Sequence, residues 1–158
     1  MLRPATDADI DAVLAWRNHP DVRTASLQQH VITEPEHRSW WARTMSDTSR
    51  RVLIYEREGH PSGVVTFFDH DLDARSACWG YYLDVEGLDE RGQTLLAWFE
   101  VQRQAVQYAF DDLGLDVLEG EQREEHRVTR AGGQGGDDLV AVARPRRRGV
   151  LVEVAGCA

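Results

Sequence analysis

Arg17 and Asn18 stand next to each other in the segment Trp16-Arg17-Asn18, directly before the pair His19-Pro20. A guanidinium beside an amide can hold a hydroxyl or a phosphate group through paired hydrogen bonds. Asn18 is also the only asparagine in the chain. The pair is therefore a candidate for holding a polar small molecule, and capping of a helix end is the alternative that the sequence leaves open.

Acid–base chemistry could come from Asp84 and from the trio Asp69-His70-Asp71. A carboxylate or an imidazole can accept a proton from a reacting amine. A solvated strand end is the alternative for the trio. We expect no metal site there, because no second cluster of ligands stands at a suitable spacing.

The composition removes several classes of function. All 18 basic residues are Arg, and the absence of Lys excludes a Schiff-base lysine and the lysine of a phosphate-binding P-loop. The net charge of −9 disfavours nucleic-acid binding, which depends on basic residues that neutralise phosphates. Cys78 and Cys157 are too few for a disulfide scaffold, and we expect Cys78 to be a small buried hydrophobic residue rather than a nucleophile.

The length of 158 residues fits a single domain. The sequence contains no apolar run long enough for a membrane span, and its first residues do not look like a signal or transit peptide. These features predict a cytoplasmic protein with no membrane partner.

Two segments have the pattern of a capped helix. Both match the capping box, in which the side chain of an acidic residue accepts a hydrogen bond from the main-chain N–H of the Thr three residues earlier. The pairs are Thr6 with Asp9 and Thr33 with Glu36. The first helix should end before His19-Pro20, which places Arg17 and Asn18 at its C-terminal end.

The remaining pattern predicts strands and one long helix. Leu2–Ala5 is an edge-strand candidate, residues 52–56 and 63–68 should form a hairpin around the turn Glu58–Ser62, and residues 75–84 should add a third strand. A helix from about Thr94 to Leu113 should bury Leu95 and Trp98/Phe99 on the same face as its later apolar residues, with Gly114 as its cap. A strand at residues 115–119 would then be parallel to the third strand, so we expect an α/β fold with a mixed, mostly antiparallel sheet flanked by helices.

The order and spacing of these residues resemble the GCN5-related N-acetyltransferases, in the branch shared by ribosomal-protein acetyltransferases of the RimJ/RimL type and amino-sugar acetyltransferases of the pseudaminic-acid type. The resemblance covers about residues 1–121. It is carried by Trp16-Arg17-Asn18, Val22-Arg23, Ile32-Thr33, Glu36-His37, Trp40-Trp41, residues 79–84 and residues 108–116.

The resemblance implies acetyl-CoA as co-substrate and no metal. It assigns cofactor binding to Leu83, Val85, Arg91, Gly92, Gln93 and Thr94, because the family presents main-chain N–H groups and a helix N-terminus to the pyrophosphate. It also implies catalytic roles for Asp84 and His70 near the thioester. Here the glycine pattern is reduced to Arg91-Gly92 with acids before it, so an ordinary turn is the alternative.

By the same resemblance, the acceptor side consists of Trp16, Arg17, Asn18, His37, Trp41 and Tyr82, with core packing as the alternative for the helical tryptophans. The implied acceptor is a small amine, either an amino sugar or a nucleotide-linked amino sugar. The N-terminus of a protein is a further alternative, and so is a catalytically impaired remnant or binding module. The oligomeric state stays open, with a homodimer as one alternative.

The pattern changes at Glu121. Residues 1–121 contain 22 acids against 11 Arg, whereas residues 122–158 contain 5 acids against 7 Arg and no aromatic residue. The family's asparagine, its tyrosine for protonating the departing thiolate and its Gly-Phe pair have no counterpart here. We therefore expect an acyltransferase-like core at 1–121 and an atypical, poorly ordered Arg/Gly/Val-rich segment at 122–158, native or frameshifted.

Overall fold

The computed structural model describes residues 1–120, 141–145 and 150–154. The elements before the sheet hairpin are β1 (Leu2–Pro4), the short 3-10 helix η1 (Asp7–Asp9), α1 (Ile10–Asn18), α2 (Pro20–Ala25) and α3 (Glu34–Ser46). They are followed by β2 (Arg51–Arg57), β3 (His60–Asp71), β4 (Ser76–Leu83), α4 (Val85–Glu90), α5 (Thr94–Gln107), the π-helical turn η2 (Tyr108–Asp112), β5 (Val117–Gly120), β6 (Ala141–Pro145) and β7 (Val150–Val154).

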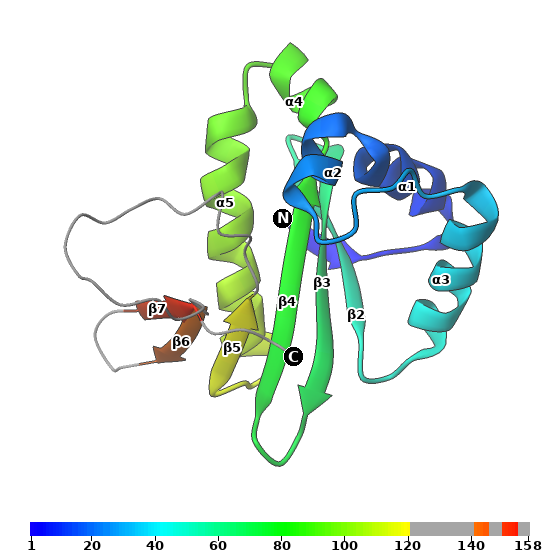
Figure 1. The fold of residues 1–158 in the computed structure, drawn as a ribbon. Coiled ribbons are helices and arrows are strands. Elements are labelled where there is room, and N and C mark those ends of the chain that lie inside the picture. The colour runs from blue at the N-terminus through cyan, green and yellow to red at the C-terminus, as the bar shows by residue number, and fades with distance from the viewer. Residues whose placement is uncertain (121–140, 146–149, 155–158) are drawn as a thin grey trace, which may run out of the picture.

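Five strands form one sheet in the order β1-β2-β3-β4-β5 (Figure 1). All neighbours are antiparallel except β4 and β5, which are parallel and are joined through α4 and α5. The mixed, mostly antiparallel sheet confirms the predicted fold class. The turn of the β2–β3 hairpin is shorter than expected, because positive φ angles at Glu58 and Gly59 close a tight turn and let both strands run further.

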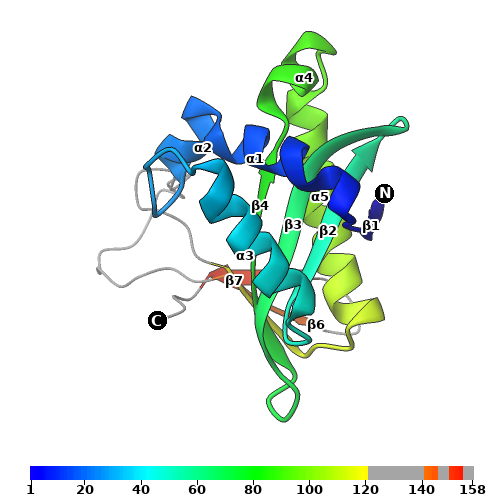
Figure 2. The ribbon, with the colours of Figure 1, turned by 90° about the vertical axis from the view of Figure 1, so that its right-hand side faces the viewer.

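Helices cover both faces of the sheet. The helices α1, α2 and α3 lie on one face and α5 lies on the other (Figures 1 and 2). Each face has its own core: Trp16, Trp41 and Ile54 belong to the α1–α3 side, and Tyr55 and Phe67 belong to the α5 side. The alternation along β2 sends neighbouring residues to opposite cores, as the period of a strand requires.

Both predicted capping boxes are confirmed. The Asp9 carboxylate accepts hydrogen bonds from the Thr6 N–H at 2.8 Å and the Thr6 hydroxyl at 3.0 Å, and Glu36 does the same for Thr33 at 2.9 and 2.7 Å. α1 ends at Asn18 as predicted. Pro20 then begins a further short helix, α2, which the sequence analysis did not anticipate.

The expected buried face of α5 is wrong in the first half of the helix. Leu95 and Phe99 are 69 and 60% exposed. The buried positions are the small residues Ala97, Val101 and Ala105. Small side chains let the helix lie close to a sheet face that already carries large aromatic rings, so the larger residues are turned outward. The predicted cap at Gly114 is confirmed by its φ of +66°.

The segment 122–158 is described only in part. β6 and β7 form an antiparallel pair, and β6 contacts β5 (Figure 1). The prediction of poor order covers residues 122–158 and stays a prediction, because 122–140, 146–149 and 155–158 lie outside the described residues. In the part of the chain that the structure describes, no helix is both long and apolar enough to cross a membrane.

Candidate active site

Among the described residues, the C-terminal half of β4 has an open edge. β5 pairs with β4 only from Ser76 to Trp79, whereas β4 continues to Leu83. No described strand pairs with Gly80–Leu83 on that side. A strand edge of this kind presents unpaired N–H and C=O groups, to which an extended ligand can add as a further strand.

The other edge of this stretch is held tightly to β3. A Cβ atom at Gly63 would lie 2.7 Å from Leu83 Cδ2 and 2.8 Å from the Tyr82 carbonyl oxygen. Only glycine allows this approach. Leu83 is buried in the α5-side core, so its main chain is placed accurately at the end of the open edge.

Asp84 lies directly after the open edge, but its carboxylate has structural contacts. Its Oδ1 accepts a hydrogen bond from the Gly87 N–H at 3.1 Å and so caps α4. Its Oδ2 lies 3.8 Å from Arg91 Nη2, and Arg91 also donates to the hydroxyl of buried Ser62 at 3.2 Å. The predicted residues Asp84 and Arg91 are thus brought together, through an ion pair that the sequence analysis did not foresee.

His70 lies far from Asp84. It stands at the opposite end of β3, near the β3–β4 hairpin tip, whereas Asp84 follows β4 beside Ser62 at the start of β3. At a rise of about 3.3 Å per residue the two are separated by roughly 25 Å. The structure does not bring the two predicted catalytic residues into one site.

The predicted phosphate-binding connection differs from a simple loop. Residues 85–90 form α4, and its carbonyl groups accept the N–H of Gly92 (to Asp89, 2.9 Å) and of Gln93 (to Leu88, 2.8 Å). These two N–H groups are therefore used within the chain. The first N–H groups of α5, on Thr94 and the next two residues, have no intrahelical acceptor and point out of the helix N-terminus.

Two carboxylates adjoin this helix N-terminus. Asp89 accepts a hydrogen bond from the Thr94 hydroxyl at 2.6 Å. Glu58 accepts one from the Gln93 amide at 2.7 Å. The acids before Arg91 were evident in the sequence, but Glu58 was not, because the β2–β3 turn brings it in from a distant part of the chain. Both acids raise the electrostatic cost of placing a phosphate here.

Asn18 and Arg23 fasten the segment that follows α2. The Asn18 amide donates to the Ile32 carbonyl oxygen and accepts from the Ile32 N–H, both at 2.8 Å. Arg23 donates to the Asn18 carbonyl oxygen at 3.1 Å and to the Gln29 carbonyl oxygen at 3.3 Å. Asn18 is thus a positioning residue for the loop rather than a group with a free amide.

Arg17 is held differently. Its Nη2 donates to the Gln28 carbonyl oxygen at 2.7 Å, whereas its Nη1 is buried without a hydrogen-bond partner among the described residues. Burial raises the pKa of the Tyr82 hydroxyl, and the nearby Arg17 charge opposes that rise. Arg17 and Tyr82, both predicted acceptor-side residues, are therefore close enough to interact electrostatically.

The other predicted acceptor-side residues lie in the helix packing. Trp16 and Trp41 belong to the core beneath α1 and α3, and the Trp41 indole donates to Asp7 Oδ1 at 3.0 Å. His37 is buried, stacks on Trp40 and has Nε2 2.8 Å from the Ile10 carbonyl oxygen. Burial lowers the pKa of His37, so it is neutral at pH 7 and donates this hydrogen bond.

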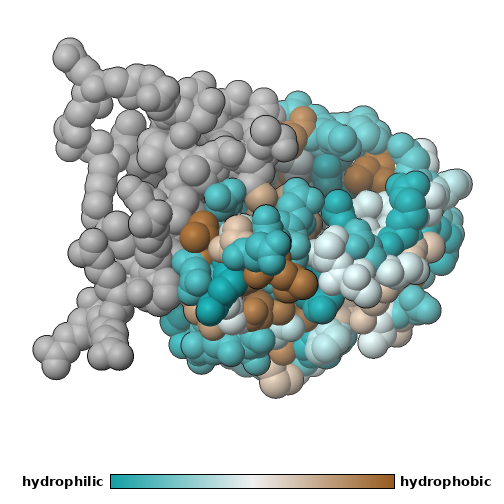
Figure 3. Space-filling view, turned by 90° about the horizontal axis from the view of Figure 1, so that it is seen from below, coloured by the Kyte–Doolittle hydropathy of each residue, from teal (hydrophilic) through white to brown (hydrophobic). Residues whose placement is uncertain are grey.

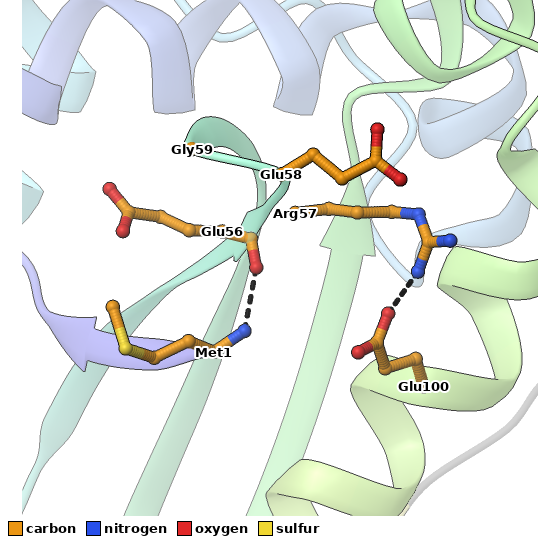
Figure 4. Close-up of a pocket in the computed structure, with 6 residues that line it drawn as sticks. All are labelled: Met1, Glu56, Arg57, Glu58, Gly59 and Glu100. Carbon is orange, nitrogen blue, oxygen red and sulfur yellow. Dashed lines mark hydrogen bonds and ion pairs between the residues drawn. The ribbon is translucent and has the colours of Figure 1, made fainter.

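A shallow hollow of about 390 Å³ lies at the β1–β2 edge of the sheet (Figure 4). The Met1 amine donates to the Glu56 carbonyl oxygen at 2.6 Å, and Arg57 forms an ion pair with Glu100 of α5. Tyr55 also donates to Glu100, at 2.7 Å. These contacts tie β2 to α5, on the far side of β3 from the open edge of β4.

Hydrophilic residues predominate among the coloured residues in the view from below, and hydrophobic residues gather near the middle of that part (Figure 3). This agrees with the excess of acids in the sequence.

A mixed, mostly antiparallel sheet that is covered by helices on both faces and has a parallel crossover through α4 and α5 is the type of fold found in N-acetyltransferases. Residues 1–131 match the acetyltransferase (GNAT) domain family. The chain belongs to this family.

Acetyltransferase PseH of Campylobacter jejuni strain 81-176 is 24% identical over 110 residues, which cover 70% of this chain and 64% of that protein. The match to PseH of strain NCTC 11168 is 26% identical over 112 residues, with the same coverage. The chain thus spans less than two thirds of the length of these curated relatives.

Solved structures share the fold. Spermidine N-acetyltransferase from Vibrio cholerae in complex with CoA and spermine is 17% identical and superposes with a TM-score of 0.63, over 79% of this chain and 72% of that chain. A domain from Methanocaldococcus jannaschii is 21% identical with a TM-score of 0.60, over 80% of this chain and 79% of that chain.

Proposed function

We propose that this protein transfers an acetyl group from acetyl-CoA to the amine of a small acceptor, and that the acceptor is an amino sugar or a nucleotide-linked amino sugar. The observation that carries the proposal is the open edge of β4 from Gly80 to Leu83, which ends beside the free N–H groups of α5. The likeness to PseH supports an amino-sugar acceptor.

The residues present fit the acyl arm of acetyl-CoA better than its phosphates. The main chain of β4 is free to pair with an extended pantetheine arm, and the Val85 N–H, the first of α4, can donate to the oxyanion of a tetrahedral intermediate. The Asp84 N–H is excluded from that role because it donates to the Ser62 carbonyl oxygen at 3.0 Å. The pyrophosphate would bind at Thr94 and the two residues after it, against the field of Asp89 and Glu58.

Acetyl-CoA supplies the activated acyl group, and the chain must supply a proton acceptor for the amine. Asp84 lies at the end of β4, where a thioester on the open edge would be attacked. Its carboxylate, which is held by Gly87 and Arg91, could receive the proton directly or through a water. His70 is too distant for this role.

A binding protein without transferase activity is a second candidate. It is favoured by the internal use of the Gly92 and Gln93 N–H groups and by the acids at the α5 N-terminus. Protein N-termini are a third acceptor class, to be included as peptides in any assay.

Calorimetric titration with acetyl-CoA, followed by an assay of CoA release with glucosamine, spermidine and a short peptide, tests the proposal. Binding together with amine-dependent CoA release supports a transferase. At about 100 times its dissociation constant, acetyl-CoA should add roughly 2.7 kcal/mol to the free energy of unfolding. Absence of binding at millimolar acetyl-CoA would refute the transferase, and binding without release to any amine would favour the impaired form.

A further inference from the structure

Two arginines near the open edge of β4 have no carboxylate partner among the described residues. Six of the eleven Arg residues in 1–121 form an ion pair with a carboxylate of the described chain, and Arg17 and Arg23 are not among them. Arg17 and Arg23 bond only to carbonyl oxygens, of Gln28, Gln29 and Asn18. The two guanidinium charges are therefore not neutralised by a direct ion pair with a described carboxylate.

The acids on the adjoining elements are engaged elsewhere. Asp21 of α2 is 78% exposed and lies 4.0 Å from His19. Glu36 of α3 holds the capping box of Thr33 and lies 3.4 Å from His30. No carboxylate of these helices is paired with Arg17, so its charge is available to a ligand.

Arg17 has an unused donor group. A buried guanidinium nitrogen without an acceptor is costly, because it loses its hydration and gains nothing in return. A planar guanidinium matches the two oxygens of a phosphate or carboxylate in a bidentate contact. Nη1 of Arg17 therefore lacks the kind of partner that an anion would supply.

The loop over Arg17 can yield to a ligand. It is fastened to the helices by polar contacts, whereas its apolar side chains Leu27 and Val31 are 67 and 57% exposed. Since the loop has little apolar packing of its own, a shift at Gln28 costs mainly one hydrogen bond. An anion that binds Nη1 would require such a shift.

Tyr82 links this charge to the open edge. It lies on β4 two residues before Asp84, and its hydroxyl has no hydrogen-bond partner among the described residues. A group bound between Arg17 and Tyr82 would thus lie close to the place where an amine reaches the thioester.

We propose that Arg17, with Tyr82, binds an anionic group on the acceptor, so that the acceptor is an amine that also carries a phosphate or carboxylate and is not a polyamine. This inference rests on the proposed function for the amine and its acetylation. It specifies the charge of the acceptor: the Arg17 guanidinium would repel a polyamine and attract a sugar phosphate or a nucleotide-linked sugar.

Glucosamine and glucosamine 6-phosphate form the probe pair, because they carry the same amine and differ by one phosphate. Loss of a charge-assisted bidentate contact in Arg17→Gln should raise the KM for the phosphorylated sugar by about ten- to hundredfold and leave the KM for glucosamine nearly unchanged. Arg17→Lys, which keeps the charge, should lie between the two, and Tyr82→Phe should have a smaller effect of the same kind. Glucuronosyl amines and nucleotide-linked amino sugars extend the series to the other sources of negative charge.

The matched control is Arg43→Gln. Arg43 lies on the outer side of α3, where its guanidinium contacts only Ser39 at 3.2 Å. The Arg43→Gln substitution removes the same charge and leaves the loop contacts of Arg17 intact. The KM for either sugar should therefore not change. Equal effects of Arg17→Gln on both sugars, or a better KM for spermidine than for the phosphorylated sugar, would overturn the proposal.

Binding measured by calorimetry separates this proposal from the transferase assignment. Arg17-dependent binding of glucosamine 6-phosphate without acetyl transfer would keep the anion site and refute the transferase. Transfer to glucosamine without any preference for the phosphate would keep the transferase and refute the anion site. Failure of the wild-type protein to bind the phosphorylated sugar at millimolar concentration would also refute the anion site.

Discussion

Replacing Asp9 by Asn should weaken the link between the edge strand and the first helix. Asp9 accepts a bidentate contact from Arg3 of β1, with both distances 2.8 Å, in addition to its capping bonds to Thr6. Arg3 also pairs with Glu56 of β2 at 2.7 Å. The start of α1, and hence the placement of Arg17 at its end, depends on this contact.

The magnitude follows from the pKa of Asp9, which the Arg3 contact lowers from 3.8 to about 2. At about 1.36 kcal/mol per pKa unit, this shift corresponds to about 2 kcal/mol of stability at neutral pH. The side chain is only 8% exposed, so solvent screens the contact little. Because the folded pKa lies below the unfolded value, the contribution is fully present above about pH 4 and is lost as the pH falls towards about 2.

Urea unfolding of the wild-type protein and of Asp9→Asn at a series of pH values measures this contribution. The variant should be less stable by about 2 kcal/mol at pH 7, and the two curves should converge as the pH approaches about 2. The control is Asp73→Asn, at the exposed tip of the β3–β4 hairpin. Parallel curves from pH 7 to pH 2, or an equal loss in the control, would refute the reasoning.

Three further outcomes are expected. Asp89→Asn should tighten acetyl-CoA binding by roughly two- to fivefold at low salt, since it removes a negative charge from the α5 N-terminus. Calorimetry measures the affinity, with exposed Glu90→Gln as control. An unchanged or weaker affinity of Asp89→Asn would mean that phosphate does not bind there. Asn18→Ala should lower the free energy of unfolding by about 2 kcal/mol, about 1 for each bond to Ile32, while acetyl-CoA affinity stays unchanged; a stable variant would contradict the positioning role. Asp84→Asn should lower the rate of acetylation without unfolding the protein, and an unaltered pH–rate profile would remove Asp84 from the mechanism.

The caps of the helices could be predicted from the sequence because each cap depends on residues that are close together in the chain. Thr6 and Asp9 are three residues apart, as are Thr33 and Glu36, and such a capping contact forms wherever the helix begins. Gly114 ends its helical segment because a left-handed residue there is cheapest as glycine. The order of strands and crossover followed from the same local patterns and the parallel connection they require.

The site was less predictable because its residues meet only after folding. The sequence marked Arg17 and Asn18 equally, yet Asn18 pairs with the main chain of Ile32, fourteen residues away, while Arg17 keeps a donor unused. It also placed Asp84 and His70 in one site, although they lie at opposite ends of a strand pair.

What the sequence determined by itself is the succession of β1 to β5 with the longer helices α1, α3 and α5, and the family to which residues 1–121 are similar, because both depend on spacing along the chain. The short helices α2 and α4 were not predicted. Only the tertiary structure decided which side of each element faces a core. Leu95 and Phe99 follow a helical period that fits burial, but the aromatic sheet face admits Ala97 and Val101 instead. The unused Nη1 donor of Arg17 and the open edge of β4 likewise depend on contacts between segments that lie far apart in the sequence.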